Sequence, residues 1–185
     1  MDAQIRRDAE ARMNKSVEKF RGDLVGVRTG KASPAILETV RVEYYGQTMP
    51  LAQIASISAP QPRLLVVQPW DKGAAEAIVK AIQAADLGLN PAPDGDLIRV
   101  PIPALTEERR RELVKQCKRM AEEVRVSIRN VRRDANDALA EANKEKQISE
   151  DDLHRAQKDI QKLTDEQMKK VDEALATKEK DILEG

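Results

Sequence analysis

Three long stretches of the 185-residue sequence carry apolar residues at spacings of three and four, with charged residues between them. This spacing places the apolar side chains on one narrow face of an α-helix. Only 2% of the residues are aromatic and 35% are charged, so such helices have little bulk for one thick core. We therefore expect long helices that pack along narrow apolar faces. The first, at residues 2–28, has the apolar positions Ile5, Ala9, Met13, Val17, Phe20, Leu24 and Val27.

The other two stretches fill the second half of the sequence. Thr106 is a candidate N-cap for a helix that runs to about residue 145, and Ser149 with Asp152 resembles the capping box that starts another helix. A helix with one narrow apolar face is not stable alone, so we expect a three-helix bundle. The second helix has the apolar positions Leu113, Cys117, Met120, Val124, Ile128, Val131, Ala135, Leu139 and Ala142.

Residues 31–105 have a different texture, with lower charge density and eight of the nine prolines between Pro50 and Pro103. Alternation from Val40 to Tyr45 predicts a strand that ends at Gly46. Further strands are expected at 54–58, 63–69 and 97–100, with a helix at 73–86; their order in a sheet is left open. The prediction is an α+β fold, in which a small β/α domain (31–105) is inserted into a long three-helix bundle (1–30 plus 106–185). Two linkers, near 29–33 and 101–105, join the domains as a two-strand hinge.

Charge is segregated along the second helix, although the whole chain is neutral. The stretch from Glu107 to Arg133 has ten basic and five acidic residues, a net charge of +5, whereas Asp134 to Asp152 has a net charge of −5. At about 100° per residue, most of the cations fall on an arc away from the apolar face. The members expected to contact an anionic partner are Lys118, Arg125, Arg129, Arg132 and Arg133.

A basic helix face has an alternative interpretation as solvated surface. A structural coiled-coil adaptor, which binds protein helices through the bundle, is another alternative. Arginine dominates this stretch, however, and its forked guanidinium suits phosphate contacts. The predicted bundle offers no aromatic platform for stacking bases, so recognition of folded RNA by shape and phosphate is favoured. A broad-specificity RNA chaperone remains a further alternative.

Catalytic and metal-binding patterns are not found. His154 is the only histidine, and Cys117 lies on an apolar helix face, so we expect neither a metal site nor a nucleophile, and no internal disulfide. No phosphate-binding glycine motif occurs, so no cofactor and no enzyme activity are expected. The sequence also shows no signal peptide or membrane span, which predicts a cytoplasmic protein. Trp70, Tyr44 and Tyr45 are expected to pack inside the small domain; the alternative is an exposed Trp70 that contacts a partner.

Five short motifs carry a resemblance to the ribosome recycling factor family of bacteria. In order they are VRTGKASP (27–34), VEYYG (42–46), DLGLNP (86–91), LTEERR (105–110) and RNVRRD (129–134). The resemblance implies an L-shaped monomer that binds the post-termination ribosome, mainly through large-subunit ribosomal RNA. With elongation factor G and GTP, such a factor splits the ribosome into subunits, and mRNA and tRNA are released.

The resemblance also implies roles for particular residues. The RNA-contacting arginines of the family correspond to Arg28, Arg110, Arg129 and Arg132, and the hinge to Gly30, Lys31, Pro103 and Ala104. Two positions depart from the family pattern: Lys31 stands where arginine is commoner, and Ala104 where a second proline is common. The lysine keeps the charge without the fork, and the alanine leaves one hinge strand less restricted.

Overall fold

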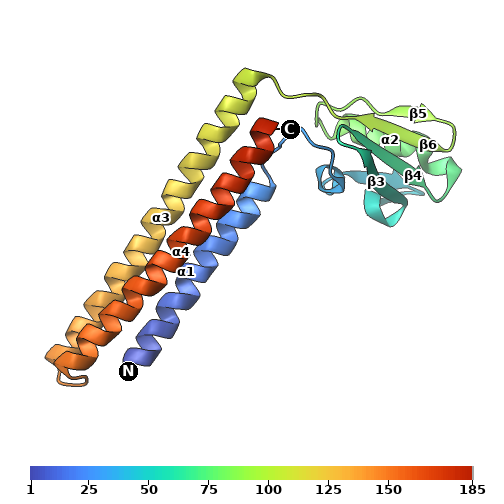
Figure 1. The fold of residues 1–185 in the computed structure, drawn as a ribbon. Helices are drawn as coiled ribbons and strands as arrows, with labels where there is room; N and C mark the ends of the chain where they lie inside the picture. Colours follow the sequence, from blue (N-terminus) through green and yellow to red (C-terminus); the bar gives the residue numbers. More distant parts are fainter. Residues whose placement is uncertain (185) are drawn as a thin grey trace. The chain divides into compact units, whose positions relative to one another are not determined.

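The computed structural model describes residues 1–184, which form two compact units. One unit comprises Met1–Thr29 and Glu107–Glu184, and the other comprises Gly30–Thr106. The first contains three long helices, α1 (Asp2–Val25), α3 (Glu107–Lys144) and α4 (Glu150–Glu184), as Figure 1 shows. The second contains six strands and the helix α2 (Ala75–Ala84). The expected α+β class, a small β/α domain inserted into a long three-helix bundle, is confirmed.

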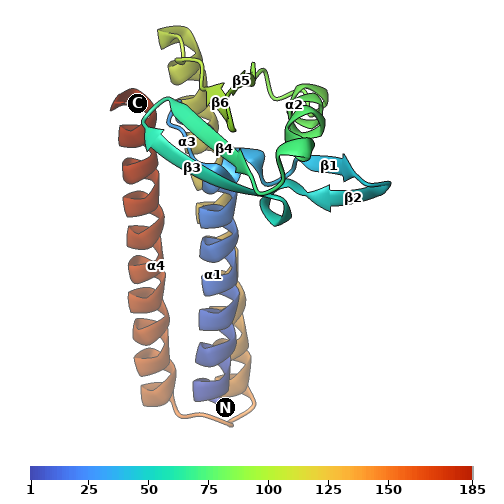
Figure 2. The same ribbon diagram turned by 90° about the vertical axis from the view of Figure 1, so that its right-hand side faces the viewer.

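The helices of the first unit run side by side, and a tight turn joins α3 to α4 (Figures 1 and 2). In this turn the Gln147 N–H donates to Ala142 O at 2.8 Å. The hydroxyl of Ser149 accepts a hydrogen bond from the Asp152 N–H at 3.1 Å, so the predicted cap of α4 is confirmed. The buried faces include Met13, Val17 and Phe20 of α1, Ile128 and Leu139 of α3, and Ile160 and Val171 of α4.

Two details of the helices differ from the sequence prediction. Helix α1 ends at Val25 rather than residue 28, because the Val27 N–H bonds Leu24 O in a tighter turn around Gly26. On α3, Ala121 is fully buried whereas Met120 and Val124 are half-buried. Helix α3 packs against both α1 and α4, so its buried face is wider than predicted and includes Ala121.

The second unit combines a hairpin with an antiparallel four-stranded sheet. Strands β1 (Arg41–Tyr44) and β2 (Gln47–Pro50) form the hairpin, and Tyr45 and Gly46 at its turn have positive φ angles of 49° and 75°. The sheet has the order β3-β4-β6-β5, built from Ala55–Gln61, Leu64–Pro69, Leu97–Pro101 and Ala92–Asp94. Short 3-10 helices lie at Pro34–Leu37, Leu51–Gln53 and Lys72–Ala74.

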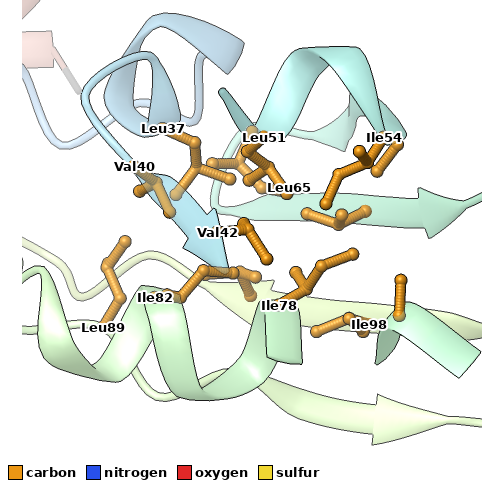
Figure 3. Close-up of a cluster of buried hydrophobic side chains, with 14 of the residues drawn as sticks. Leu37, Val40, Val42, Leu51, Ile54, Leu65, Ile78, Ile82, Leu89 and Ile98 are labelled. Carbon is orange, nitrogen blue, oxygen red and sulfur yellow. The ribbon is translucent and has the colours of Figure 1, made fainter. Parts of the chain in front are cut away.

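The core of this second unit is aliphatic (Figure 3). Strand β1 and helix α2 contribute Val42, Ile78 and Ile82, which face one another. The expectation that Trp70 and Tyr45 pack inside is wrong, because their exposed fractions are 68% and 84%. Trp70 follows the last residue of β4 and Tyr45 occupies the hairpin turn, so neither backbone position faces the core. The core also includes Leu37, Val40, Leu51, Ile54, Leu65, Leu89 and Ile98.

Candidate nucleic-acid interface

Helix α3 presents some of its basic residues away from its packing face. Cys117, Ile128 and Leu139 are fully buried against the neighbouring helices, whereas Lys118 and Arg133 are exposed. Because a helix turns by about 100° per residue, the apolar period that buries one face fixes the position of the cations on the other. The outward direction predicted for Lys118 and Arg133 is therefore present in the structure.

Glu122 divides this basic surface. Its Oε1 lies 3.0 Å from Arg129 Nη1, and its Oε2 lies 3.3 Å from Arg125 Nη1. The hydrogen bond from Arg129, followed by that from Arg125, lowers the pKa of Glu122 below its ordinary value. The carboxylate stays ionised at neutral pH, so it compensates part of the positive charge of these two arginines.

Arg125 joins α3 to α4 instead of pointing freely outward. Its Nη2 lies 2.7 Å from Asp172 Oδ1 of α4, and its side chain is 23% exposed. The hydrogen bond to Asp172 is the main cause that raises the pKa of Arg125, against the opposing effect of burial. At 100° per residue Arg125 borders the apolar face, so its long side chain reaches the neighbouring helix. This guanidinium is already engaged within the bundle.

Three other predicted residues keep an uncompensated charge. Arg132 Nη1 donates to Gln161 Oε1 of α4 at 3.3 Å, and because this acceptor is a neutral amide the arginine keeps its net charge. Within residues 1–184, neither Lys118 nor Arg133 lies within ion-pair distance of a carboxylate. These three side chains are therefore able to contact phosphate oxygens.

Arg28 and Arg110 lie at one end of the bundle, away from the others. Arg28 is exposed just beyond α1, and half-buried Arg110 is in the first turn of α3, where its Nη1 donates to Leu183 O of α4 at 3.1 Å. Arg110 and Arg129 are separated along the helix by about 28 Å at 1.5 Å per residue. Lys118, Arg129, Arg132 and Arg133 thus form a stripe along α3 and not a pocket, a shape suited to a polymer with repeated phosphates, and Arg28 and Arg110 lie apart from this stripe.

A shallow hollow on α3 adds two basic residues that were not selected as site residues from the sequence. Lys115 and Arg119 line it, and its volume is about 640 Å³. Lys115 lies four residues after Arg111 and Arg119 four residues after Lys115, and this spacing contained the signal, since residues four apart are neighbours on a helix surface. The lining residues are Arg109, Glu112, Lys115, Gln116, Lys118 and Arg119, of which four are basic and one is acidic.

The side chains considered for chemistry occupy unsuitable places. Cys117 is fully buried and burial raises the pKa of its thiol, which disfavours the reactive thiolate. His154 is exposed near the start of α4, with Nε2 3.8 Å from Glu150 Oε1. Over residues 1–184, no three histidine, cysteine or acidic side chains gather as metal ligands. None of the helices described is apolar over enough of its length to cross a membrane.

Comparison with known proteins identifies the family of the chain. The profile of the family described as ribosome recycling factor matches residues 20–183. The ribosome-recycling factor of Novosphingobium aromaticivorans is 56% identical over 176 residues, which cover 95% of each chain. That of Symbiobacterium thermophilum is 53% identical over 184 residues and covers 100% of both.

Two solved structures that resemble this chain are also ribosome recycling factors. A solution structure of the ribosome recycling factor is 42% identical, has a TM-score of 0.77 and covers 100% of this chain and 98% of its own. A second structure, with 49% identity, a TM-score of 0.65 and 99% coverage of both chains, describes the T. thermophilus ribosome recycling factor and the E. coli elongation factor G bound to the E. coli post-termination complex. The five sequence motifs, the fold and these full-length similarities lead to one conclusion: the chain belongs to the ribosome recycling factor family.

Proposed function

We propose that this chain binds the post-termination bacterial ribosome in the cytoplasm and, with elongation factor G and GTP, promotes its dissociation into subunits. mRNA and tRNA are released in the process. The observation that carries this proposal is family membership over the whole chain. The structure of a relative on the post-termination complex, with elongation factor G, supports the same partners for this chain. The factor does no chemistry of its own in this proposal; it acts by binding and by being displaced.

The grip on large-subunit ribosomal RNA is assigned to the stripe on α3 and the adjoining end of α1. Arg132, Arg133 and Lys118 contact phosphates directly, since no carboxylate compensates their charge. Arg129 also contacts phosphate, although Glu122 compensates part of its charge. Arg125 positions α3 against α4. Arg28 and Arg110 provide contacts at the end of the bundle.

The hinge is assigned to the linker residues Gly30, Lys31, Pro103 and Ala104. Two hydrogen bonds support these limits: the Ala32 N–H donates to Pro62 O at 2.6 Å, and the Ile102 N–H donates to Arg63 O at 2.8 Å. Both bonds fix the chain to the loop between β3 and β4. Bending between the units is therefore confined to the short segments that precede Ala32 and follow Ile102.

The proposal is tested by sedimentation with ribosomes and by a subunit-splitting assay, with and without elongation factor G and GTP. We expect splitting only in the presence of both, and a slope of log affinity against log salt of roughly −3 to −5 for four to six phosphate contacts. Substitution of Arg132→Ala should weaken ribosome binding several-fold, whereas Arg21→Ala, an exposed arginine of α1, should leave it unchanged.

Two outcomes would contradict these assignments. An unaltered ribosome affinity in Arg132→Ala would mean that the stripe on α3 does not contact the RNA. Equal binding to many unrelated RNAs, with no splitting of ribosomes, would instead favour the RNA chaperone.

A further inference from the structure

Strand β1 has one edge that pairs with β2 and one edge that does not. The Leu51 N–H donates to Val40 O at 3.2 Å, which makes these two residues a hydrogen-bonded pair of the hairpin. In an antiparallel ladder such pairs recur at every second residue, so Val42 also bonds toward β2. The backbone N–H and C=O groups of Arg41 and Glu43 therefore point away from β2. Within residues 1–184 no other strand pairs with them.

The open edge of β1 borders a groove of about 540 Å³ that β1 shares with α2. Helix α2 turns Ile78 and Ile82 into the core (Figure 3), so the residues left at the groove are small or charged. Ala77 and Ala81 leave room beside the strand, and one turn carries the ion pair of Lys80 Nζ with Glu76 Oε1 at 3.0 Å. The groove thus lies between the open edge of β1 and a side of α2 that carries alanines.

We propose that this groove binds an extended segment of another protein, which adds to β1 as an antiparallel strand. Backbone groups at strand spacing are complementary to another strand and to little else. The groove, at about 540 Å³, has room for the three residues that would lie opposite Arg41, Val42 and Glu43. The binding needs no ribosome, so it stands apart from the function proposed above.

The side chains of β1 specify the order of charges in the bound segment. Residues directly opposite one another in an antiparallel pair lie on the same face. The residue opposite Val42 therefore faces the alanines of α2, and those opposite Arg41 and Glu43 lie beside these charged side chains. Because the segment runs antiparallel to β1, it meets Glu43 first and Arg41 last. A complementary segment accordingly reads basic–apolar–acidic from its N-terminus.

A second copy of this chain is a less suitable occupant, although its own β1 has this order of charges at 41–43. Pairing of two β1 strands would bring the second α2 to the same face of the extended sheet. The first α2 already borders the open edge there, so the two helices would compete for the same space. A segment without a helix beside it meets no such obstacle.

The test is a titration of the isotopically labelled full chain with two acetylated peptides, TTKVETT and TTEVKTT, followed by the backbone amide signals. We expect TTKVETT to shift the amide signals of Arg41 and Glu43 and to slow their hydrogen exchange. The reversed peptide should bind about tenfold more weakly, because it places like charges opposite one another at two positions. The double substitution Arg41→Glu with Glu43→Arg should invert this preference.

A variant that fills the groove provides the control for position. Ala81→Phe should abolish peptide binding, whereas Ala59→Phe, at an exposed position of β3, should not. The amide signals of Leu65 and Ile98 report whether each variant keeps the folded core. Three results would each overturn the proposal: no shift at Arg41 and Glu43 with either peptide, equal affinity for both peptides, or the same shifts when the chain alone is concentrated. The last would identify a second copy as the occupant.

Discussion

The helical unit and the small unit are each stabilised by a different kind of internal contact. The core of the small unit is a compact aliphatic cluster, whereas the bundle adds polar contacts between its helices. Gln167 Nε2 of α4 donates to Asn14 Oδ1 of α1 at 2.8 Å, and the hydroxyls of Ser16 and Ser127 lie 3.0 Å apart. Narrow apolar faces can slide past one another by a turn, and such polar pairs fix one register. Packing of apolar side chains determines the fold of the small unit, and polar pairs help to fix the register of the helices in the bundle.

This comparison is tested most severely by removing bulk from each core in turn. Ile78→Ala should cost the small unit about 2–5 kcal/mol in free energy of unfolding, and Ile128→Ala should cost the bundle a similar amount. Because the two units have separate cores, we expect each variant to accelerate hydrogen exchange mainly in its own unit. Equal acceleration in both units by either variant would show that they unfold as one.

Two glycines provide a smaller test, one in each unit. Gly30 has φ +79°, and a Cβ added there would lie 3.3 Å from Leu105 Cγ, so Gly30→Ala should destabilise the small unit by about 1–2 kcal/mol. Gly22 lies in α1, and a Cβ there would meet nothing within 4 Å. Gly22→Ala should therefore stabilise the bundle by about 0.5–1 kcal/mol. Urea unfolding measures both, and the same sign for the two variants would contradict this account.

The sequence predicted the long helices closely because their apolar period extends over many turns. It missed β2 and β5, which are short and contain Pro50 and Pro93, residues that argue against a strand except at an edge. The strand order was likewise beyond reach, since pairing between strands distant in sequence leaves no local pattern. Local spacing determines an element, but its neighbours depend on the tertiary fold.

The same limit applies to the candidate interface. The helical period correctly placed Lys118 and Arg133 outward, because that direction depends on α3 alone. It could not show that Arg125 reaches Asp172, since the acid lies on another helix distant in sequence. Trp70 was misplaced for a related reason: its bulk suggested burial, but its position after β4 leaves it outside the core.

Arg125 and Arg133 separate stability from binding within one helix. Arg125→Ala removes the ion pair with Asp172 and should lower the free energy of unfolding by about 0.5–1 kcal/mol. Arg133→Ala should change it by less than about 0.5 kcal/mol, because the side chain is exposed, and it should weaken ribosome binding instead. Urea unfolding and ribosome sedimentation are measured on both variants. A larger loss of stability in Arg133→Ala would reverse the roles assigned to the two residues.

The smallest expected effect is a pH dependence in the small unit. The Tyr44 hydroxyl donates to Asp71 Oδ2, which raises the pKa of Tyr44 to about 12 and lowers that of Asp71 below its ordinary value. For Tyr44, whose folded pKa is raised, the contribution to stability is complete below pH 10.0 and is lost as the pH rises toward about 12. For Asp71, whose folded pKa is lowered, the contribution is complete above pH 3.8 and is lost as the pH falls further.

The ultraviolet absorbance of tyrosinate tests this contact directly, because the chain has only two tyrosines. We expect one of them to titrate near pH 12. Asp71→Asn should lower the pKa of that tyrosine, because the negative charge that accepts the hydrogen bond of the phenol is removed. Glu43→Gln is the matched control, as it neutralises a carboxylate on β1 that is not among the causes of the raised pKa of Tyr44. A titration that Asp71→Asn leaves unchanged would mean that the Tyr44 hydroxyl is not held by Asp71 in solution. The segment after β4 would then lack this polar contact with the hairpin.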